Sequence, residues 1–274
     1  MIEAAGGQVQ LGATADHILV AGGRVFGVAF SQDGARRTEY TNHVISAMGI
    51  VNTVSCLDTT TAPAWQDTLL GLRPGLAHLA LYVGFDDDIA AAGASGANIW
   101  IYENEDIGRV RHNVADDAPP GLFVSFPSLK DPERTGKPTA EVIALCDTQA
   151  FAPWLHASDG RRSAPYVELK GRIESRMLAQ FCRHFPALAP LIRFHELSTP
   201  LSQQRYLHSP DGAMYGMEMT ANRLTTPSLR VRTPVHGLLL AGQDVTGPGV
   251  AGTFMGGLMA AAAIEPTLLR QLVA

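Results

Sequence analysis

Short runs of apolar and β-branched residues fill the first fifty positions and predict a small antiparallel meander. The segment GGQVQLGATADHILVAGGRVFGVAF is interrupted at residues 21–23, a Gly-rich break typical of a β-hairpin. A third strand is expected at residues 36–40, after the turn at 32–34. The apolar run at residues 43–47 then returns toward a larger sheet.

The middle of the chain mixes strand and helix patterns. A helix is expected at residues 65–72, ended by Pro74 and Gly75, and a Pro-rich charged loop at 127–138. Residues 166–185 form the best amphipathic helix, ended by Pro186, because apolar side chains recur there at helical spacing. Strands are expected at residues 77–84, 98–102, 122–126 and 139–146.

The last forty residues are the most informative. Residues 237–242, GLLLAG, read as a buried strand, followed by a glycine-rich turn, a small-residue helix at 250–264 and an amphipathic turn ending at 273. Residues 245–264 carry no charge and are long enough to span a bilayer. Pro248 and the many Gly and Ala residues favour a buried turn and helix instead.

Composition narrows the class of protein. With 274 residues, 46% of them hydrophobic and 17% charged, the chain can form a sizeable core. A net charge of −5 argues against a nucleic-acid partner. Cys56, Cys146 and Cys182 form no CxxC pair, and the start of the chain shows no signal peptide. We therefore expect no metal site and a cytoplasmic location, with peripheral membrane contact left open.

The candidate chemistry lies in the glycine-rich turn. Gly247, Gly249 and Gly252 match the spacing GxGxxG, between a strand and a helix. Too few residues follow for a complete βαβ unit, and no acidic residue with a following strand stands where a ribose ligand is expected. The match to a dinucleotide fingerprint is therefore weak.

Two interpretations of the turn stay open at this point. Glycines let a ligand approach the backbone, and a helix N-terminus favours negative charge, such as develops on a flavin during reduction. Asp244 would then accept hydrogen bonds from sugar-alcohol hydroxyls. Alternatively, the glycines serve close packing of the helix on a sheet, and Asp244 caps a turn or helix.

A resemblance bears on this choice. The segment GLLLAGQDVTGPGVAGTFMGGLMAAAAI resembles the C-terminal flavin motif of the phytoene desaturase, carotenoid isomerase and retinol saturase group. The meander, VISAMGIVNT, FPSLKDPERTGKPT and FPALAPLIRFHELSTPLSQQRYLHSPDGAMYG resemble the same group in the same order. The resemblance therefore covers nearly the whole chain.

The resemblance implies an FAD-dependent oxidoreductase with a discontinuous cofactor domain. Ala15 falls where a backbone contact to adenine is expected, although the family usually has Val there. The expected ribityl and isoalloxazine contacts are Gly242, Asp244, Gly249, Val250, Ala251, Gly252 and Thr253. The pyrophosphate loop and first βαβ unit, roughly half of a family member, have no counterpart in these residues.

Substrate and catalytic residues are less well defined. Arg205, Tyr206 and Tyr215 lie in the family-like stretch and would line a substrate tunnel, or they would support the turn at residues 210–212. His195 and Glu196 begin like HExxH, but Thr199 replaces the second histidine. We name no catalytic acid or base, because the flavin itself exchanges the hydride.

These observations predict an α/β fold: a partial, glutathione-reductase-like FAD-binding domain with a β-meander, and a mixed α+β substrate domain. The FAD-binding parts are expected at residues 1–60 and 226–274, and the substrate domain at 61–225. The function implied is desaturation, saturation or isomerisation of carbon–carbon bonds in a long apolar polyene or lipid. Three forms are open: a truncated protein inactive alone, one chain of a split enzyme with a separate N-terminal half, or a non-catalytic apolar-ligand binder.

Overall fold

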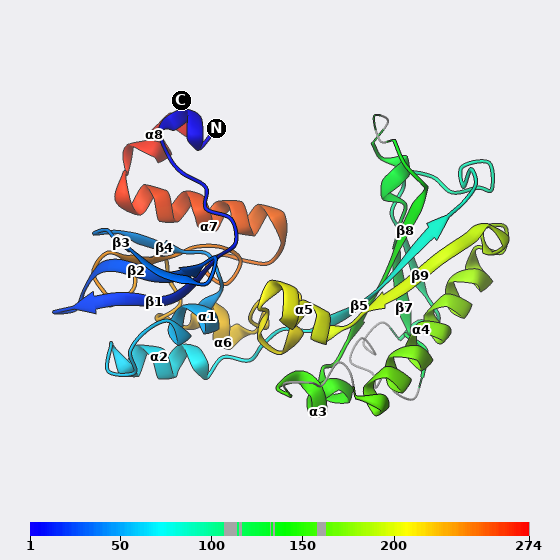
Figure 1. Cartoon of the computed structure of the whole chain (residues 1–274), viewed down its shortest axis with the longest axis horizontal. Helices are drawn as coiled ribbons and strands as arrows, with labels where there is room; N and C mark the ends of the chain where they lie inside the picture. Colours follow the sequence, from blue (N-terminus) through cyan, green and yellow to red (C-terminus); the bar gives the residue numbers. More distant parts are fainter. Residues whose placement is uncertain (107–113, 115–116, 132, 134, 158–162, 274) are drawn as a thin grey trace. The chain divides into compact units, whose positions relative to one another are not determined.

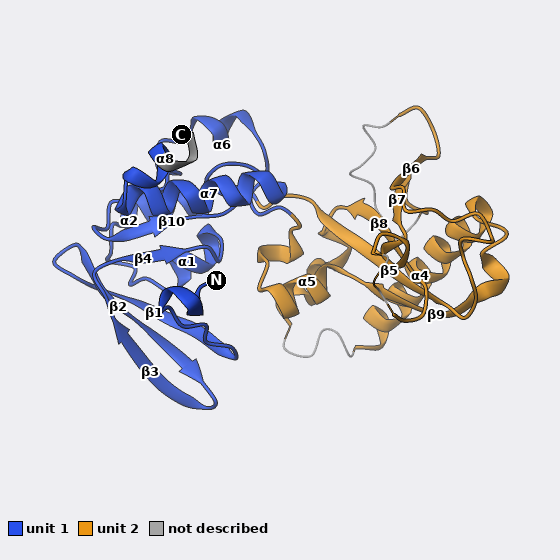
Figure 2. Ribbon diagram, turned by 90° about the horizontal axis from the view of Figure 1, so that it is seen from above, with its two compact units in different colours: residues 1–73, 215–274 blue, residues 74–214 orange. Residues whose placement is uncertain are grey.

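The computed structural model describes the whole chain except residues 107–113, 115–116, 132, 134, 158–162 and 274. The chain divides into two compact units (Figure 2). Unit 1 comprises residues 1–73 and 215–274, and unit 2 comprises residues 74–214. The domain boundaries expected after residue 60 and before residue 226 lie instead after residue 73 and before residue 215. The reason is that Trp65, Leu69 and Met217 pack in the core of unit 1.

Unit 1 contains the expected meander (Figure 1). The strands β1 (Ala13–Ala21), β2 (Arg24–Gln32) and β3 (Ala35–Tyr40) pair antiparallel in that order. Gly22 and Gly23 form the first turn with φ of +56° and +73°, a conformation that glycine adopts without strain. The hairpin predicted at this break is confirmed.

A short parallel sheet forms the second layer of unit 1. The strands β4 (Val44–Ser46) and β10 (Leu238–Leu240) pair in parallel, although residues 47–237 separate them in the sequence. The apolar runs at 43–47 and 237–242 therefore form strands of one sheet, as an α/β fold requires. The helices of the unit are α1 (Ile50–Ser55), α2 (Pro63–Leu70), α6 (Ala221–Thr225), α7 (Gly249–Ile264) and α8 (Thr267–Val273).

Unit 2 is built on one antiparallel sheet of order β6-β7-β8-β5-β9. The strands are β5 (Ala77–Phe85), β6 (Ile99–Tyr102), β7 (Gly121–Ser125), β8 (Thr139–Cys146) and β9 (Ile192–Ser198). Residues of β8 alternate strictly between buried and half-buried positions, so one face of the sheet packs on the core. The loop predicted at 127–138 includes residues 132 and 134, which lie outside the described residues.

The helix α4 (Ala164–His184) covers that face, close to the predicted span. Its buried side chains include Leu169, Ile173, Met177 and Phe181, at the predicted helical spacing. The shorter helices of unit 2 are α3 (Ala152–Leu155) and α5 (Pro200–Leu207).

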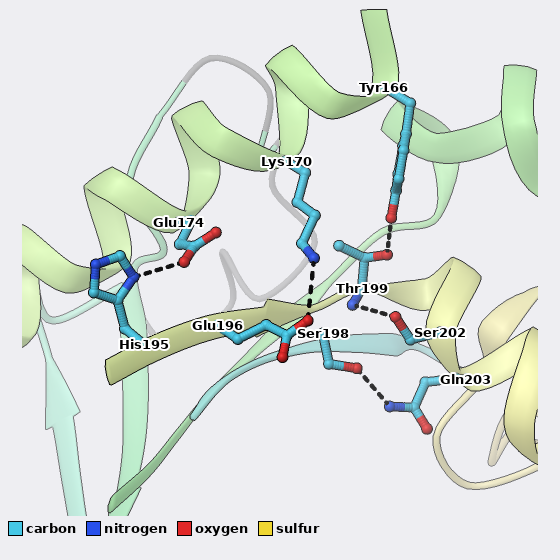
Figure 3. A network of polar contacts seen from close by, with 9 residues as sticks. All are labelled: Tyr166, Lys170, Glu174, His195, Glu196, Ser198, Thr199, Ser202 and Gln203. Carbon is cyan, nitrogen blue, oxygen red and sulfur yellow. Dashed lines mark hydrogen bonds and ion pairs between the residues drawn. The ribbon is translucent and has the colours of Figure 1, made fainter. Parts of the chain in front are cut away.

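Polar contacts fasten α4 to the edge strand β9 (Figure 3). The Tyr166 hydroxyl lies 2.7 Å from Thr199 Oγ1, and Glu174 Oε1 lies 2.7 Å from His195 Nδ1. Thr199 is also the N-cap of α5, where its side chain and that of Ser202 form a capping box. His195 and Glu196 thus lie on a strand and make structural contacts.

The sequence pattern did not reveal β9, α1 or α5. Most side chains of β9 are exposed because it is an edge strand, so the alternation that marks a half-buried strand is weak. In the described part of the chain, no helix is both long and apolar enough to cross a membrane. The charge-free stretch at 245–264 forms a glycine turn followed by the 16-residue helix α7.

The contacts of Glu103 predict that the stability of unit 2 decreases at acid pH. Its Oε1 lies 2.9 Å from His184 Nε2, and accepts hydrogen bonds from Gln180 and Arg183. The hydrogen bond from His184 is the largest of the causes that hold the pKa of Glu103 below 4.5. Because the pKa of Glu103 is lower in the folded than in the unfolded state, its ionised form stabilises the fold at any pH above the unfolded-state pKa. This stabilisation is lost as the pH falls through the folded-state pKa.

We therefore expect Glu103→Gln to lower the melting temperature at pH 6, and this difference from the parent to shrink at acid pH well below 4.5. Thermal unfolding followed by circular dichroism across this range is the measurement. An equal difference at both pH values would contradict this assignment. The exposed Glu196→Gln serves as a control.

Candidate functional site

The glycine-rich turn links the end of β10 to the start of α7 in unit 1. It begins at Gly242, with φ of +90°, and ends at Gly249, with φ of +82°. Both conformations favour glycine. The strand–turn–helix context predicted for this stretch is therefore present.

Asp244 is the central residue of the turn. Its side chain is buried, with 3% of the residue exposed. Oδ2 accepts a hydrogen bond of 3.0 Å from the Ile50 N–H, at the first turn of α1. Oδ1 accepts one of 2.9 Å from the Met217 N–H. One carboxylate thus joins three segments that are far apart in the sequence.

Two glycines lie against this carboxylate, and Gly216 makes room for it. A Cβ atom on Gly216 would lie 2.0 Å from Asp244 Oδ1, and Gly216 has φ of +68°. A Cβ atom on Gly49 would lie 3.4 Å from Oδ2. Any side chain at position 216 would displace the carboxylate. Both glycines are therefore part of the site, although the sequence offered no signal that singled them out.

Arg223 completes the buried network, and sequence reasoning also missed it. Only 3% of Arg223 is exposed, and its guanidinium donates to the carbonyl oxygens of Met217, Gln243 and Asp244. Burial lowers the pKa of Arg223, while the charge of Asp244 opposes that shift. The Asp244 carboxylate accepts from the Met217 N–H, and the Arg223 guanidinium donates to the Met217 carbonyl oxygen. Arg223 also donates to the Gln243 carbonyl oxygen, so the two charged groups together fix Met217 against the glycine turn.

The N-terminus of α7 is open. Its N-cap is Pro248, whose side chain makes no capping hydrogen bond in the described structure. A Cβ atom added at Gly247 or Gly249 would meet no atom within 4 Å, and Val250 is 75% exposed. The backbone N–H groups of a first helical turn lack intrahelical partners and favour negative charge. The turn therefore has room for a planar, electron-accepting group beside Gly249–Ala251.

Gly252 and Thr253 of the predicted set, and Gly256 outside it, lie in close contact with other protein atoms. A Cβ atom on Gly252 would lie 2.0 Å from the Gly247 carbonyl oxygen, and one on Gly256 would lie 2.6 Å from that of Gly242. Thr253 Oγ1 donates to the Gly249 carbonyl oxygen at 2.9 Å. The close-packing interpretation thus accounts for Gly252, and the open-turn interpretation for Gly247 and Gly249.

The predicted cofactor and substrate contacts all stay predictions. Ala15 lies beside a register shift of β1, and its carbonyl oxygen is 3.6 Å from Cys56 Sγ. Arg205 and Tyr206 lie on α5 of unit 2, where Tyr206 is 73% exposed, and Tyr215 lies in unit 1.

A cavity of about 250 Å³ in unit 1 lies away from the glycine turn. It is lined by His43, His236 and Arg232, with Ala263 and Ile264 from the last turn of α7. These residues border the first residues of β10 and the C-terminal end of α7, whereas the turn follows β10 and precedes α7. The cavity is therefore not part of the candidate site.

Replacing Asp244 should destabilise unit 1 even without any ligand. Asp244→Ala leaves the buried N–H groups of Ile50 and Met217 unpaired, at about 1–3 kcal/mol each. We expect a loss of about 2–5 kcal/mol in the free energy of unfolding, measured by urea denaturation. Asp67→Ala, an exposed position of α2, is the matched control and should change little. An unchanged stability in Asp244→Ala would show that the carboxylate is dispensable to the fold.

Comparison with known proteins places the chain beside one group of enzymes. No protein-family model matches it. All-trans-retinol 13,14-reductase of Danio rerio is 30% identical over 276 residues, covering 94% of this chain and 46% of that protein. The proteins of the same name from Rattus norvegicus and Homo sapiens are 28% and 27% identical. A Danio rerio protein named inactive all-trans-retinol 13,14-reductase is 25% identical.

Solved structures agree on the fold. A redesigned putrescine oxidase matches with a TM-score of 0.62 and 17% identity, covering 96% of this chain and 51% of that one. An oxidoreductase from Methanosarcina mazei matches with a TM-score of 0.57 and 16% identity, again covering 96% and 51%. The chain is thus a relative of the all-trans-retinol 13,14-reductases, spans about half their length, and has the fold of the corresponding half of these oxidoreductases.

Proposed function

We propose that this chain is the flavin-cradling and substrate-binding part of an FAD-dependent oxidoreductase that acts on carbon–carbon double bonds of a long apolar polyene or lipid. The observation that carries the proposal is the open N-terminus of α7, held in place by the buried Asp244–Arg223 network. The sequence relation to all-trans-retinol 13,14-reductases supports the substrate class. We expect the chain to be inactive without a further nucleotide-binding part.

Residues of unit 1 fit the flavin in a specific way. FAD supplies hydride exchange when it is bound. The N–H groups of Val250 and Ala251 would donate to an electron-rich edge of its ring, and the positive end of the α7 dipole would favour charge there. Gly247 and Gly249 leave the space free of side chains. Asp244 would act mainly by positioning this turn, because both of its carboxylate oxygens already accept backbone hydrogen bonds.

Unit 2 offers an apolar surface for such a substrate. Trp100, Phe123 and Ile143 lie directly opposite one another in neighbouring strands, so they form one row across the sheet. Ala80 is the next residue of the row, but it is only 2% exposed and adds nothing to the surface. This row belongs to the face opposite the buried positions that pack toward α4.

Aromatic rings dominate the exposed part of this row. Trp100 is 62% exposed, with its ring 4.9 Å from that of Phe123 and 6.5 Å from that of Tyr102. Flat aromatic side chains suit a conjugated hydrocarbon, because both are apolar and planar. We call this surface the outer face of unit 2. Its aromatic side chains support the proposal that the substrate is a polyene.

The same face favours a second candidate function, an apolar-ligand-binding protein without catalysis. That function needs unit 2 alone and no flavin. Retinoid binding combined with no detectable affinity for FAD would favour it over the redox proposal.

Filling the space before α7 should weaken flavin binding. Gly247→Val adds a side chain where no protein atom lies within 4 Å, so the fold should tolerate it. We expect the intact chain to quench FAD fluorescence on titration, and the variant to bind at least about tenfold more weakly. Gly171→Val, an equally open glycine of α4, is the matched control. Equal affinity in both variants, or no quenching by the parent, would refute the flavin site.

Removing the largest exposed ring of the outer face should weaken apolar-ligand binding. Trp100→Ser is expected to raise the dissociation constant for all-trans-retinol about fivefold, which corresponds to about 1 kcal/mol. Retinol fluorescence enhancement is the measurement. Leu70→Ser removes a side chain of unit 1 that is 51% exposed, and should leave retinol binding unchanged. The same loss in both variants would mean non-specific adsorption.

A further inference from the structure

The cavity at the first residues of β10 combines basic side chains with a small volume. It measures about 250 Å³ and is bordered by His43, Arg232 and His236, which are all exposed. Among the described residues that line it there is no Asp or Glu. Sites that enclose drug-sized ligands measure roughly 300–1,000 Å³, so this one suits a smaller ligand. We call it the basic cavity.

The sheet of unit 1 brings these three residues together from separate segments. His43 directly precedes β4, which pairs with β10 in parallel. Arg232 forms an antiparallel bridge with Leu239, on the other side of β10. His236 lies two residues before the start of β10 itself. Basic side chains from β10 and from both of its neighbours therefore border one cavity.

The helix α7 holds Arg232 at the wall of the basic cavity. Arg232 Nη2 donates to the Ala263 carbonyl oxygen at 2.6 Å, in the last turn of the helix. A guanidinium has five N–H donors, and this hydrogen bond uses one of them. The planar fork of donors matches the oxygens of phosphate and carboxylate groups. The backbone contact thus positions the guanidinium before a ligand arrives.

The turn that carries Arg232 and His236 is braced from within. The Thr233 hydroxyl lies 3.1 Å from the Val235 carbonyl oxygen and 3.0 Å from that of Leu238. It also accepts a hydrogen bond of 3.1 Å from the Val235 N–H. Because the turn is already ordered, a ligand that contacts both basic side chains has less conformational entropy to remove.

The positive charge of the basic cavity has no counter-ion among the described residues. None of the ion pairs in this part of the chain involves His43, Arg232 or His236. Glu265 follows the last turn of α7, but its carboxylate accepts from the N–H and the hydroxyl group of Thr267. Uncompensated charge in a concave site concentrates ions of the opposite sign. The ligand that fits is therefore an anion.

We propose that the basic cavity binds a phosphate group. A phosphate ester carries up to about two negative charges and three acceptor oxygens, enough to meet His43, Arg232 and His236 together. A carboxylate offers one charge and two oxygens. Inorganic phosphate and a small phosphate ester share the required chemistry, and the test below separates them. The basic cavity lies outside the glycine-rich turn, so this inference does not rest on the proposed flavin chemistry.

The test is isothermal titration calorimetry of the full chain with inorganic phosphate at constant ionic strength. The parent should bind, and its melting temperature should rise with phosphate concentration. Arg232→Gln and His236→Ala should each weaken binding at least about fivefold, because each removes a charged or hydrogen-bonding partner. Arg36→Gln removes a cation from the exposed strand β3 and should leave binding unchanged.

Melting temperatures measured without phosphate show whether the variants fold. Arg232→Gln also alters the contact with Ala263, whereas His236→Ala leaves that contact in place. A loss of binding in His236→Ala at an unchanged melting temperature therefore supports the site even if Arg232→Gln is destabilised.

Methyl phosphate and acetate identify the ligand. Tighter binding of methyl phosphate than of inorganic phosphate would support an ester as the ligand, and the reverse order would support inorganic phosphate. Acetate that binds as tightly as either would overturn the assignment to a phosphate group. So would a parent chain with neither a binding heat nor a rise in melting temperature, or equal weakening by Arg36→Gln. All of these measurements use flavin-free protein, so their failure is distinguishable from a failure of the FAD titration.

Discussion

The two backbone hydrogen bonds accepted by the Asp244 carboxylate are the constraint on which the rest of unit 1 depends. They fix the start of α1 and the Gly216–Met217 segment against the turn that follows β10. A buried carboxylate is costly unless it is paired and hydrogen-bonded, and the cation of Arg223 provides the compensating charge. Because Arg223 donates to the carbonyl oxygens of Met217, Gln243 and Asp244, it also holds the turn backbone in one conformation.

This arrangement explains how a flexible, glycine-rich sequence presents an ordered helix terminus. Glycines at 247 and 249 leave open space, whereas those at 216, 252 and 256 are required by neighbouring protein atoms. The same residue type thus performs two tasks in one motif. The internal glycines bring α7 close to the turn, and the external ones keep its first N–H groups accessible to a ligand.

Unit 2 distributes its apolar residues between two faces of one sheet. The face toward α4 is a closed core, with Leu81, Val124 and Val142 fully buried. The outer face carries aromatic rings that stay exposed, among them Trp100 and Tyr102. An antiparallel sheet normally pairs a buried apolar face with a polar solvated one. Around Trp100 and Tyr102 the outer face departs from that rule, and this aromatic part is what makes a polyene or lipid ligand physically reasonable.

The sequence by itself determined the elements with strong periodicity. The hairpin around Gly22, the alternating strand β8 and the helix α4 follow from local patterns, because their side chains repeat every two or every three to four residues. Several sequence segments also resemble the retinol saturase group in the same order. That resemblance led to the expectation of a flavin beside Gly249.

Only the tertiary structure decided which residues build the site. Arg223, Gly216 and Gly49 approach Asp244 from distant parts of the chain, and nothing in their local sequence distinguishes them from ordinary surface or turn residues. The edge strand β9 was not predicted for a related reason. Most of its side chains are exposed, so buried and exposed positions do not alternate along it. Local sequence encodes periodicity and turns, whereas burial and hydrogen-bond partners arise only when residues far apart in the chain are brought together.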